Sequence, residues 1–127
     1  MKLEPVTEGE LSILEVIWAE EAPTSRDLAV AIYERVSDSK VASVQKLLER
    51  LEAKGYVGRD RRARAHRFHA LVARKEFLQH ELRQLADRHC GGAIAPLVTA
   101  LLRAKGVSKK ERQQLLQQID ELWPEEK

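Results

Sequence analysis

Arginine side chains are concentrated in one short stretch of the chain, and their spacing favours the binding of anions over catalysis. Five of them lie between residues 59 and 67. Residues 40–75 contain eleven basic and three acidic residues, a balance of +8, while residues 1–39 balance at −6 and residues 76–127 at zero. His66 and His69 belong to the same basic segment. This uneven charge predicts a surface that binds a polyanion; a solvated basic face that contacts nothing is the alternative.

No pattern typical of an enzyme accompanies these charges. The sequence has no Ser-His-Asp order, P-loop or glycine-rich phosphate loop. His80 and His89 lie nine residues apart on a predicted helix and therefore near its opposite sides, so that only two chains together could bring them to one metal ion. The single cysteine, Cys90, excludes an intrachain disulfide and a multi-cysteine metal site, and a helix C-terminus does not favour its thiolate. We therefore expect no enzymatic activity, no cofactor and no metal.

The residues before the basic stretch predict three helices. Helix starts are marked by capping boxes, in which a hydroxyl residue is followed three positions later by a carboxylate: Thr7 with Glu10, Thr24 with Asp27, and Ser108 with Glu111. Apolar residues at helical spacing predict helices over residues 8–20, 25–35 and 40–54, the third with Ser39 as its N-cap. Gly55 follows the last turn, where a left-handed C-terminal cap favours glycine.

After Gly55 the helical period is lost. Val57, Phe68 and their neighbours predict two short antiparallel strands joined by a basic tip. A basic extension of the helix is the alternative, because Ala and Arg favour helix, but Gly55 and Gly58 argue against it. Three more helices are predicted over residues 73–89, 93–104 and 108–122, and Trp18 and Trp123 are expected to pack at helix ends.

Three helices followed by a basic hairpin is the order of a winged helix-turn-helix, whose third helix enters the major groove of DNA while the hairpin, or wing, contacts the backbone. Val44, Leu48 and Leu51 form the predicted inner stripe of the third helix. Its outer face is small, hydroxylic or cationic near the N-terminus, although an ordinary solvated face is the alternative. Base contacts are expected from Ser43, Gln45 and Lys46. Phosphate contacts are expected from the cations of this helix and the hairpin: Lys40, Arg50, Arg59, Arg61, Arg62, Arg64 and Arg67.

Three stretches of the chain resemble the penicillinase-repressor (BlaI/MecI/CopY) family. Residues 3–18 resemble its start, with a Thr cap, a Glu-Leu pair and a later Ile-Trp pair; residues 23–28 resemble its second helix, and residues 43–57 its recognition helix and the entry to its wing. The resemblance covers residues 3–70 and continues more loosely to the end. It implies a mainly α protein, with a winged-helix DNA-binding domain over residues 1–73 and a helical dimerisation domain over residues 74–127. It also implies a homodimer that represses promoters at inverted repeats of double-stranded DNA.

Two switches of this family do not carry over to the chain. Its best-known members are inactivated when a membrane sensor protease, the further partner that the resemblance implies, cuts an Asn-Phe bond, and this sequence has no Asn. The copper-responsive branch uses a C-terminal cysteine pair motif, and this sequence has only Cys90. The inducing signal therefore stays open.

The last three predicted helices carry more apolar surface than a region of about 50 residues buries alone. We expect two chains to pair there and to bury the stripes around Leu97, Leu101, Leu115 and Ile119. No apolar run approaches the ~20 residues that cross a bilayer, and no signal-like segment opens the sequence, so a cytoplasmic protein without membrane insertion is expected. A winged-helix adaptor that binds protein instead of DNA is the alternative function.

Overall fold

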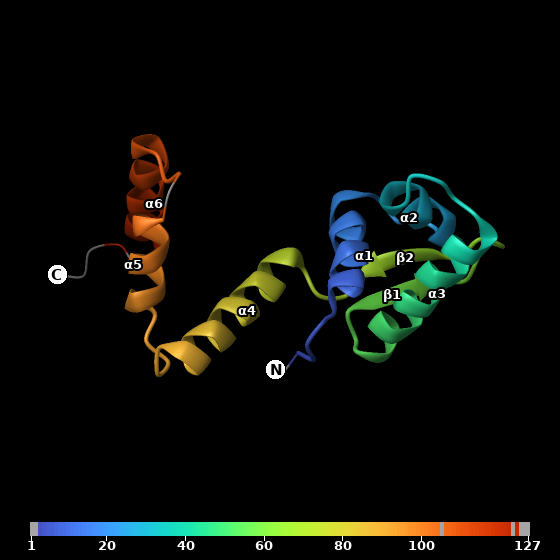
Figure 1. Ribbon diagram of the computed structural model, residues 1–127, viewed down its shortest axis with the longest axis horizontal. Helices are drawn as coiled ribbons and strands as arrows, with labels where there is room; N and C mark the ends of the chain where they lie inside the picture. Colours follow the sequence, from blue (N-terminus) through green and yellow to red (C-terminus); the bar gives the residue numbers. More distant parts are fainter. Residues whose placement is uncertain (1–2, 105, 123, 125–127) are drawn as a thin grey trace. The chain divides into compact units, whose positions relative to one another are not determined.

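The structure, a computed structural model, describes residues 3–104, 106–122 and 124. Its elements follow the order α1 (Glu8–Ala19), α2 (Ser25–Ile32), α3 (Asp38–Ala53), β1 (Val57–Asp60), β2 (Arg67–Ala70), α4 (Arg74–His89), α5 (Ala95–Arg103) and α6 (Lys109–Leu122) (Figure 1). The chain divides into two compact units, Met1–His80 and Glu81–Lys127, and the division falls within α4.

Capping boxes begin the first two helices, as the sequence predicts. The Thr7 hydroxyl accepts a hydrogen bond from the Glu10 N–H at 3.2 Å, and the Glu10 carboxylate accepts one from the Thr7 N–H at 2.8 Å. Thr24 and Asp27 make the same reciprocal pair at 3.1 and 3.0 Å. Each box satisfies backbone N–H groups that the first helical turn leaves unpaired, and both predictions are confirmed.

The turn between α2 and α3 differs from the prediction. Helix α2 ends at Ile32, because Tyr33 adopts an extended backbone, and α3 begins at Asp38 with Ser37 as its N-cap. The Ser37 hydroxyl accepts a hydrogen bond from the Lys40 N–H at 3.3 Å, so the predicted N-cap at Ser39 is wrong by two residues. Ser37 and Ser39 both suit an N-cap; with Ser37 in that place, Asp38 lies in the first turn, where the helix dipole favours a negative charge.

Apolar side chains from α1, α2, α3, the hairpin and the start of α4 form the core of the first unit. Fully buried residues include Ile13, Leu14, Leu28, Val44, Leu48 and Leu51. Trp18 packs against this core as predicted: its indole N–H donates to the Val72 carbonyl at 3.0 Å, and its ring lies 5.5 Å from that of Phe77. The same prediction for Trp123 falls outside the described residues.

The predicted hairpin is confirmed. Strands β1 and β2 pair antiparallel, with Val57 opposite Ala70 and Arg59 opposite Phe68. Gly55 precedes β1 in the left-handed region, with φ +84°, and the N–H groups of Gly55 and Tyr56 cap the last carbonyls of α3. Phe68 also donates its N–H to the Pro23 carbonyl at 2.9 Å, which ties β2 to the turn before α2. Three helices followed by this hairpin form a winged helix-turn-helix in a mainly helical protein.

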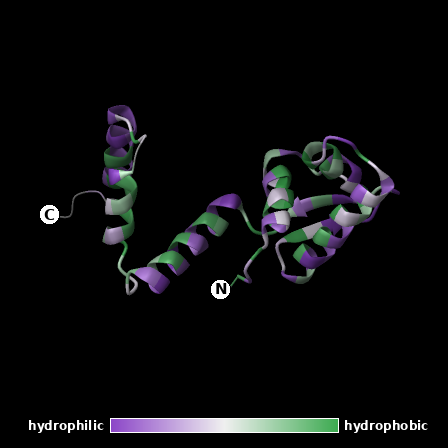
Figure 2. Cartoon of the chain, in the orientation of Figure 1, coloured by the Kyte–Doolittle hydropathy of each residue, from purple (hydrophilic) through white to green (hydrophobic). Residues whose placement is uncertain are grey.

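The second unit contains little buried apolar surface. Helix α5 begins at Ala95, with Pro96 in its first turn and no side-chain cap, and α6 begins after Ser108, whose hydroxyl accepts from the Glu111 N–H at 3.0 Å. Among the described residues of this unit, Ala86 is the only fully buried hydrophobic residue. Figure 2 shows hydrophobic residues along α5 and a mixture of hydrophobic and hydrophilic ones along α6. None of the described helices has the length and apolar character needed to span a membrane.

Candidate nucleic-acid interface

Helix α3 presents the predicted base-reading residues at its surface. Its inner side is fixed by Val44, Leu48 and Leu51, which are fully buried in the core. Val41 and Leu47 are half-buried against the same core, whereas Ser43, Gln45 and Lys46 are all exposed. The rigid attachment of one side therefore holds the other side in a defined direction, as the reading of base edges requires.

The polar side chains on this face keep hydrogen-bonding capacity. The Ser43 hydroxyl donates to the Ser39 carbonyl at 3.0 Å, which leaves its oxygen able to accept. Among the described residues, no hydrogen bond or ion pair engages the side chain of Gln45 or of Lys46. A shallow surface hollow runs along this side of the helix and is lined by Ser43, Lys46, Leu47, Glu49 and Arg50.

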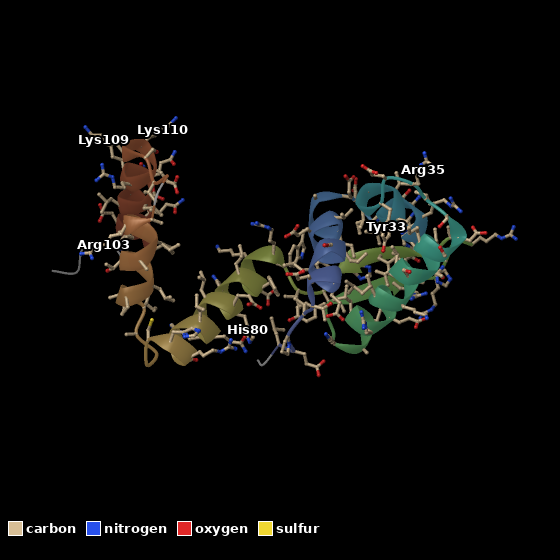
Figure 3. The ribbon with its side chains drawn as sticks, in the orientation of Figure 1. Tyr33, Arg35, His80, Arg103, Lys109 and Lys110 are labelled. Carbon is tan, nitrogen blue, oxygen red and sulfur yellow. The ribbon has the colours of Figure 1, made fainter. Side chains whose placement is uncertain are left out.

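Further cations lie in the first turn of α3 and in the turn before it. The Lys40 ammonium lies over the Tyr33 ring, 4.7 Å from the ring centroid. Figure 3 shows Tyr33 at the end of α2 and the Arg35 side chain extending away from the turn. The aromatic contact holds the Lys40 ammonium near the start of α3, and Lys40 as a whole remains exposed.

At the other end of α3, the buried carboxylate of Glu10 gathers two cations. The Lys54 ammonium donates to Glu10 Oε1 at 2.6 Å and to the Pro5 carbonyl at 2.8 Å. Arg50 Nε lies 3.5 Å from Glu10 Oε2, and the Arg50 side chain remains 58% exposed. Burial by itself raises the pKa of the Glu10 carboxyl, but Lys54, the Thr7 N–H and Arg50 together hold that pKa below its ordinary value.

The sequence pattern predicts Glu10 as a capping residue but does not predict its ion pairs with Lys54 and Arg50. Helical spacing supplies the available signal, since it puts Glu10 on the same side of α1 as Ile13, Leu14 and Ile17. A carboxylate on a buried face needs cationic partners. The identity of the cations that pair with Glu10 depends on how α1 packs against α3, which no local sequence pattern indicates.

The base of the wing contains the most enclosed of the predicted phosphate-binding cations. Arg59 Nε donates to both carboxylate oxygens of Glu52, at 3.1 and 3.2 Å, and Nη2 donates to Oε1 of the same group. Its guanidinium carbon lies 4.7 Å from the centroid of the Phe68 ring. Arg61 Nη2 lies 4.0 Å from Glu52 Oε2, at the limit of an ion pair, and most of the Arg61 side chain is exposed.

The tip of the wing exposes the other arginines. Arg62 makes a forked pair with Asp60, at 2.7 to 3.1 Å, and hydrogen bonds from the Arg62 side chain and backbone hold the pKa of the Asp60 carboxyl well below its usual range. Arg67 donates to the Ala22 carbonyl at 2.8 Å. Arg64 is exposed and has no hydrogen bond or ion pair within the described part of the chain.

The histidines, Cys90 and the predicted interface residues of the second unit are the remaining candidates. His66 is half-buried, 3.3 Å from Arg59 Nη1, and the His80 ring accepts a hydrogen bond from the Leu3 N–H at 3.4 Å. Cys90 is a half-buried free thiol. Across residues 3–104, 106–122 and 124, no group of three His, Cys, Asp or Glu side chains is placed to hold a metal ion. In the second unit Leu97 is half-buried, while Leu101, Leu115 and Ile119 are exposed.

Comparison with known proteins identifies the family of the chain. The penicillinase repressor family matches residues 6–121. Among solved structures, the crystal structure of a MepR mutant from a multidrug-resistant S. aureus clinical isolate is similar, with 19% sequence identity, a TM-score of 0.47 and coverage of 92% of this chain and 76% of that chain. No curated protein matches the chain. Since the family match covers most of its length, the chain belongs to the penicillinase repressor family and is a transcriptional repressor, not an enzyme.

Proposed function

We propose that the chain acts in the cytoplasm as a homodimer that binds inverted-repeat operator DNA. In each subunit α3 enters the major groove, and the wing follows the neighbouring backbone. The observation that carries this proposal is the outer face of α3, where Ser43, Gln45 and Lys46 are exposed on a helix whose other side is fixed in the core. An adaptor that binds acidic protein surfaces would not need small and amide side chains at the centre of a basic face.

The proposed contacts divide by chemistry. Ser43, Gln45 and Lys46 read base edges, because hydroxyl, amide and ammonium groups match the donors and acceptors of the major groove. The exposed cations neutralise phosphates: Lys40, Arg50, Arg61, Arg62, Arg64 and Arg67. The wing arginines contact the backbone and thus add affinity without sequence preference.

The second unit supplies the proposed dimer contact. Its exposed apolar side chains include the predicted interface residues Leu101, Leu115 and Ile119, and it lacks a core of its own within the described residues. Pairing of two such units about a two-fold axis would bury these side chains. It would also tie two recognition helices together, which matches the symmetry of an inverted repeat.

A salt titration tests the DNA-binding proposal. Binding to a mixed-sequence DNA duplex is measured at several salt concentrations. If about four to six cations of each subunit contact phosphates, the logarithm of the affinity falls linearly with the logarithm of the salt concentration, by about 0.9 per contact. A flat response, or no binding at low salt, would contradict the proposal and favour the adaptor function.

A further inference from the structure

Arg59 lies on the inner face of the wing, away from the side that the proposed DNA contacts need. Side chains alternate between the two faces of a strand, so Arg59 shares a face with the buried Val57. Across the hairpin it is paired with Phe68, which is also buried in the core. Arg59 therefore points towards the body of the unit, whereas the exposed cations Arg61, Arg62 and Arg64 lie beyond the strand, at the tip.

All three nitrogens of the Arg59 guanidinium already have partners. Nε and Nη2 both donate to the Glu52 carboxylate, and Nη1 lies 3.3 Å from His66 Nδ1. One face of the guanidinium is covered by the Phe68 ring, at 4.7 Å. The two side chains of the ion pair are only 19% and 24% exposed. Glu52 thus occupies the Nε–Nη2 edge with which an arginine binds a phosphate in a forked manner, and the low exposure of Arg59 distinguishes it from Arg62, whose side chain is 90% exposed.

Glu52 makes the ion pairs that connect α3 to the wing. It lies near the C-terminal end of α3, on the helix that carries Ser43, Gln45 and Lys46. Within the described residues, every ion pair between α3 and the hairpin segment ends on this carboxylate, from Arg59 and from Arg61. The Glu52–Arg59 pair therefore lies where the recognition helix and the wing meet.

We propose that Arg59, which the sequence alone places among the phosphate contacts, is a positioning residue that docks the wing on α3 through Glu52. The inference rests on the proposed DNA-binding function and assigns different roles to the arginines of the wing. Arg59 contacts no phosphate; it fixes the direction in which Arg61, Arg62 and Arg64 extend. A bidentate pair supplies that fixed geometry, which a lysine could not replace.

The direction in which a substitution of Glu52 changes the affinity for DNA distinguishes a positioning role of Arg59 from a phosphate contact. Glu52→Gln removes a negative charge close to the DNA surface and frees Arg59. If Arg59 were a phosphate contact, this change would tighten binding to a mixed-sequence duplex. If Arg59 positions the wing, Glu52→Gln weakens binding, by about threefold or more, although the net charge of the chain becomes more positive. Glu15→Gln is the matched control, because it removes the same charge from an exposed position on α1 that the proposed DNA contacts do not include, and it is expected to leave binding unchanged or slightly tighter.

Exchanging the charges of Glu52 and Arg59 tests whether the ion pair itself is needed for DNA binding. Arg59→Glu alone is expected to weaken binding strongly, and Glu52→Arg combined with Arg59→Glu is expected to return the affinity to within about threefold of wild type. Tighter binding by Glu52→Gln, or failure of the charge exchange to restore binding, would overturn the positioning role.

Amide hydrogen exchange of the free protein reports on the wing without DNA. Glu52→Gln is expected to speed exchange in β1 and β2 relative to α1, and the charge-exchanged double variant is expected to restore the slow rates. Unchanged exchange in the hairpin would also overturn the inference. Failure of the wild-type chain to bind the duplex would instead contradict the proposed function, and the exchange rates would still decide whether the pair docks the wing.

Discussion

At the scale of single residues, the proposed DNA-binding surface gives different tasks to side chains of α3 and of the wing. Gln45 is exposed, its side chain has no hydrogen-bond partner among the described residues, and its amide can both donate to and accept from a base edge. Arg62, by contrast, is a cation at the wing tip, and phosphates are the same in every sequence. Under the proposed function, specificity and affinity are therefore expected to reside on different residues.

Substitution of Gln45 tests this separation. A preferred duplex is first obtained by selection from a random DNA pool. Gln45→Ala is expected to weaken binding to that duplex by about 1 to 3 kcal/mol, the range for one good base contact, and to change binding to a mixed-sequence duplex much less. Gln79→Ala, on the exposed surface of α4, is the control and should leave both affinities unchanged. Equal losses on both duplexes for Gln45→Ala would show that α3 does not read bases at this position.

Glu10 acts on stability rather than on recognition. Its buried carboxylate closes the α1 capping box and holds Lys54 and Arg50 at the end of α3. Glu10→Gln keeps the shape but removes the charge that both cations face. We expect it to lower the free energy of unfolding by about 1 to 3 kcal/mol at neutral pH, as measured by urea denaturation. The exposed Glu15 lies on the same helix and serves as a control. Glu15→Gln should change the free energy of unfolding much less than Glu10→Gln does.

The pH dependence of the same variant follows from the lowered pKa of Glu10. In the unfolded chain this carboxyl has its ordinary pKa of 4.5, and in the folded chain its pKa lies below that value. Its ionised form thus contributes stability that is complete above the unfolded pKa and is lost as the pH falls through the folded pKa. The difference in stability between wild type and Glu10→Gln should therefore shrink as the pH is lowered past 4.5. A difference that stays constant into acid would show that the charge of Glu10 is not what stabilises the wild-type fold.

At the scale of elements, the wing should add affinity without sequence preference. Arg61→Ala combined with Arg62→Ala removes two cations from the exposed tip, and it should weaken binding to the selected and the mixed-sequence duplex by similar factors and reduce the salt dependence. Lys109→Ala combined with Lys110→Ala removes the same charge from the start of α6, where both side chains are exposed and extend away from the helix in Figure 3. That control should reduce binding much less. Greater loss on the selected duplex alone would mean that the wing reads bases.

The elements themselves could largely be predicted from the sequence, because their signals are local. Thr7 with Glu10 and Thr24 with Asp27 mark helix starts within four residues, and Gly55 marks a helix end by its backbone freedom alone. The start of α3 has a weaker local signal, since Ser37 and Ser39 both suit an N-cap and the choice between them depends on how the turn after α2 packs. The loss of helical period after Gly55 predicts the wing.

The charged contacts between elements could not be predicted in the same way. Glu52 and Arg59 are seven residues apart and lie on different elements, and Glu10 and Lys54 are 44 residues apart. Both pairs form because α1 and the hairpin pack on α3, which is a property of the assembled core. Alternation from Val57 does indicate that Arg59 faces inward, and this signal could have separated it from the cations at the tip.

At the scale of the whole molecule, the two units differ in how much apolar surface they bury. The first has a core that extends into α4, because the Phe77 ring lies 5.5 Å from that of Trp18 and 6.1 Å from that of Tyr56. The described part of the second buries only Ala86 and leaves leucine side chains exposed on α5 and α6. Exposed apolar surface of this extent is typical of a surface that a partner covers. A second copy of the same unit is the partner that the repressor proposal requires.

One substitution in each unit tests that assignment. Leu101 and Val30 are equally exposed, at 60% and 61%, and lie on α5 and α2. If α5 belongs to the dimer contact, Leu101→Glu places a charge in an apolar interface and should convert a dimer into a monomer in sedimentation equilibrium, whereas Val30→Glu should leave the dimer intact. The monomeric variant should still bind one half-site, but weakly, because it loses the effective concentration that a linked partner provides. A fragment of residues 1–80, which retains Phe77, should behave in the same way. A wild-type chain that sediments as a monomer, or a Leu101→Glu variant that remains a dimer, would contradict the role of the second unit.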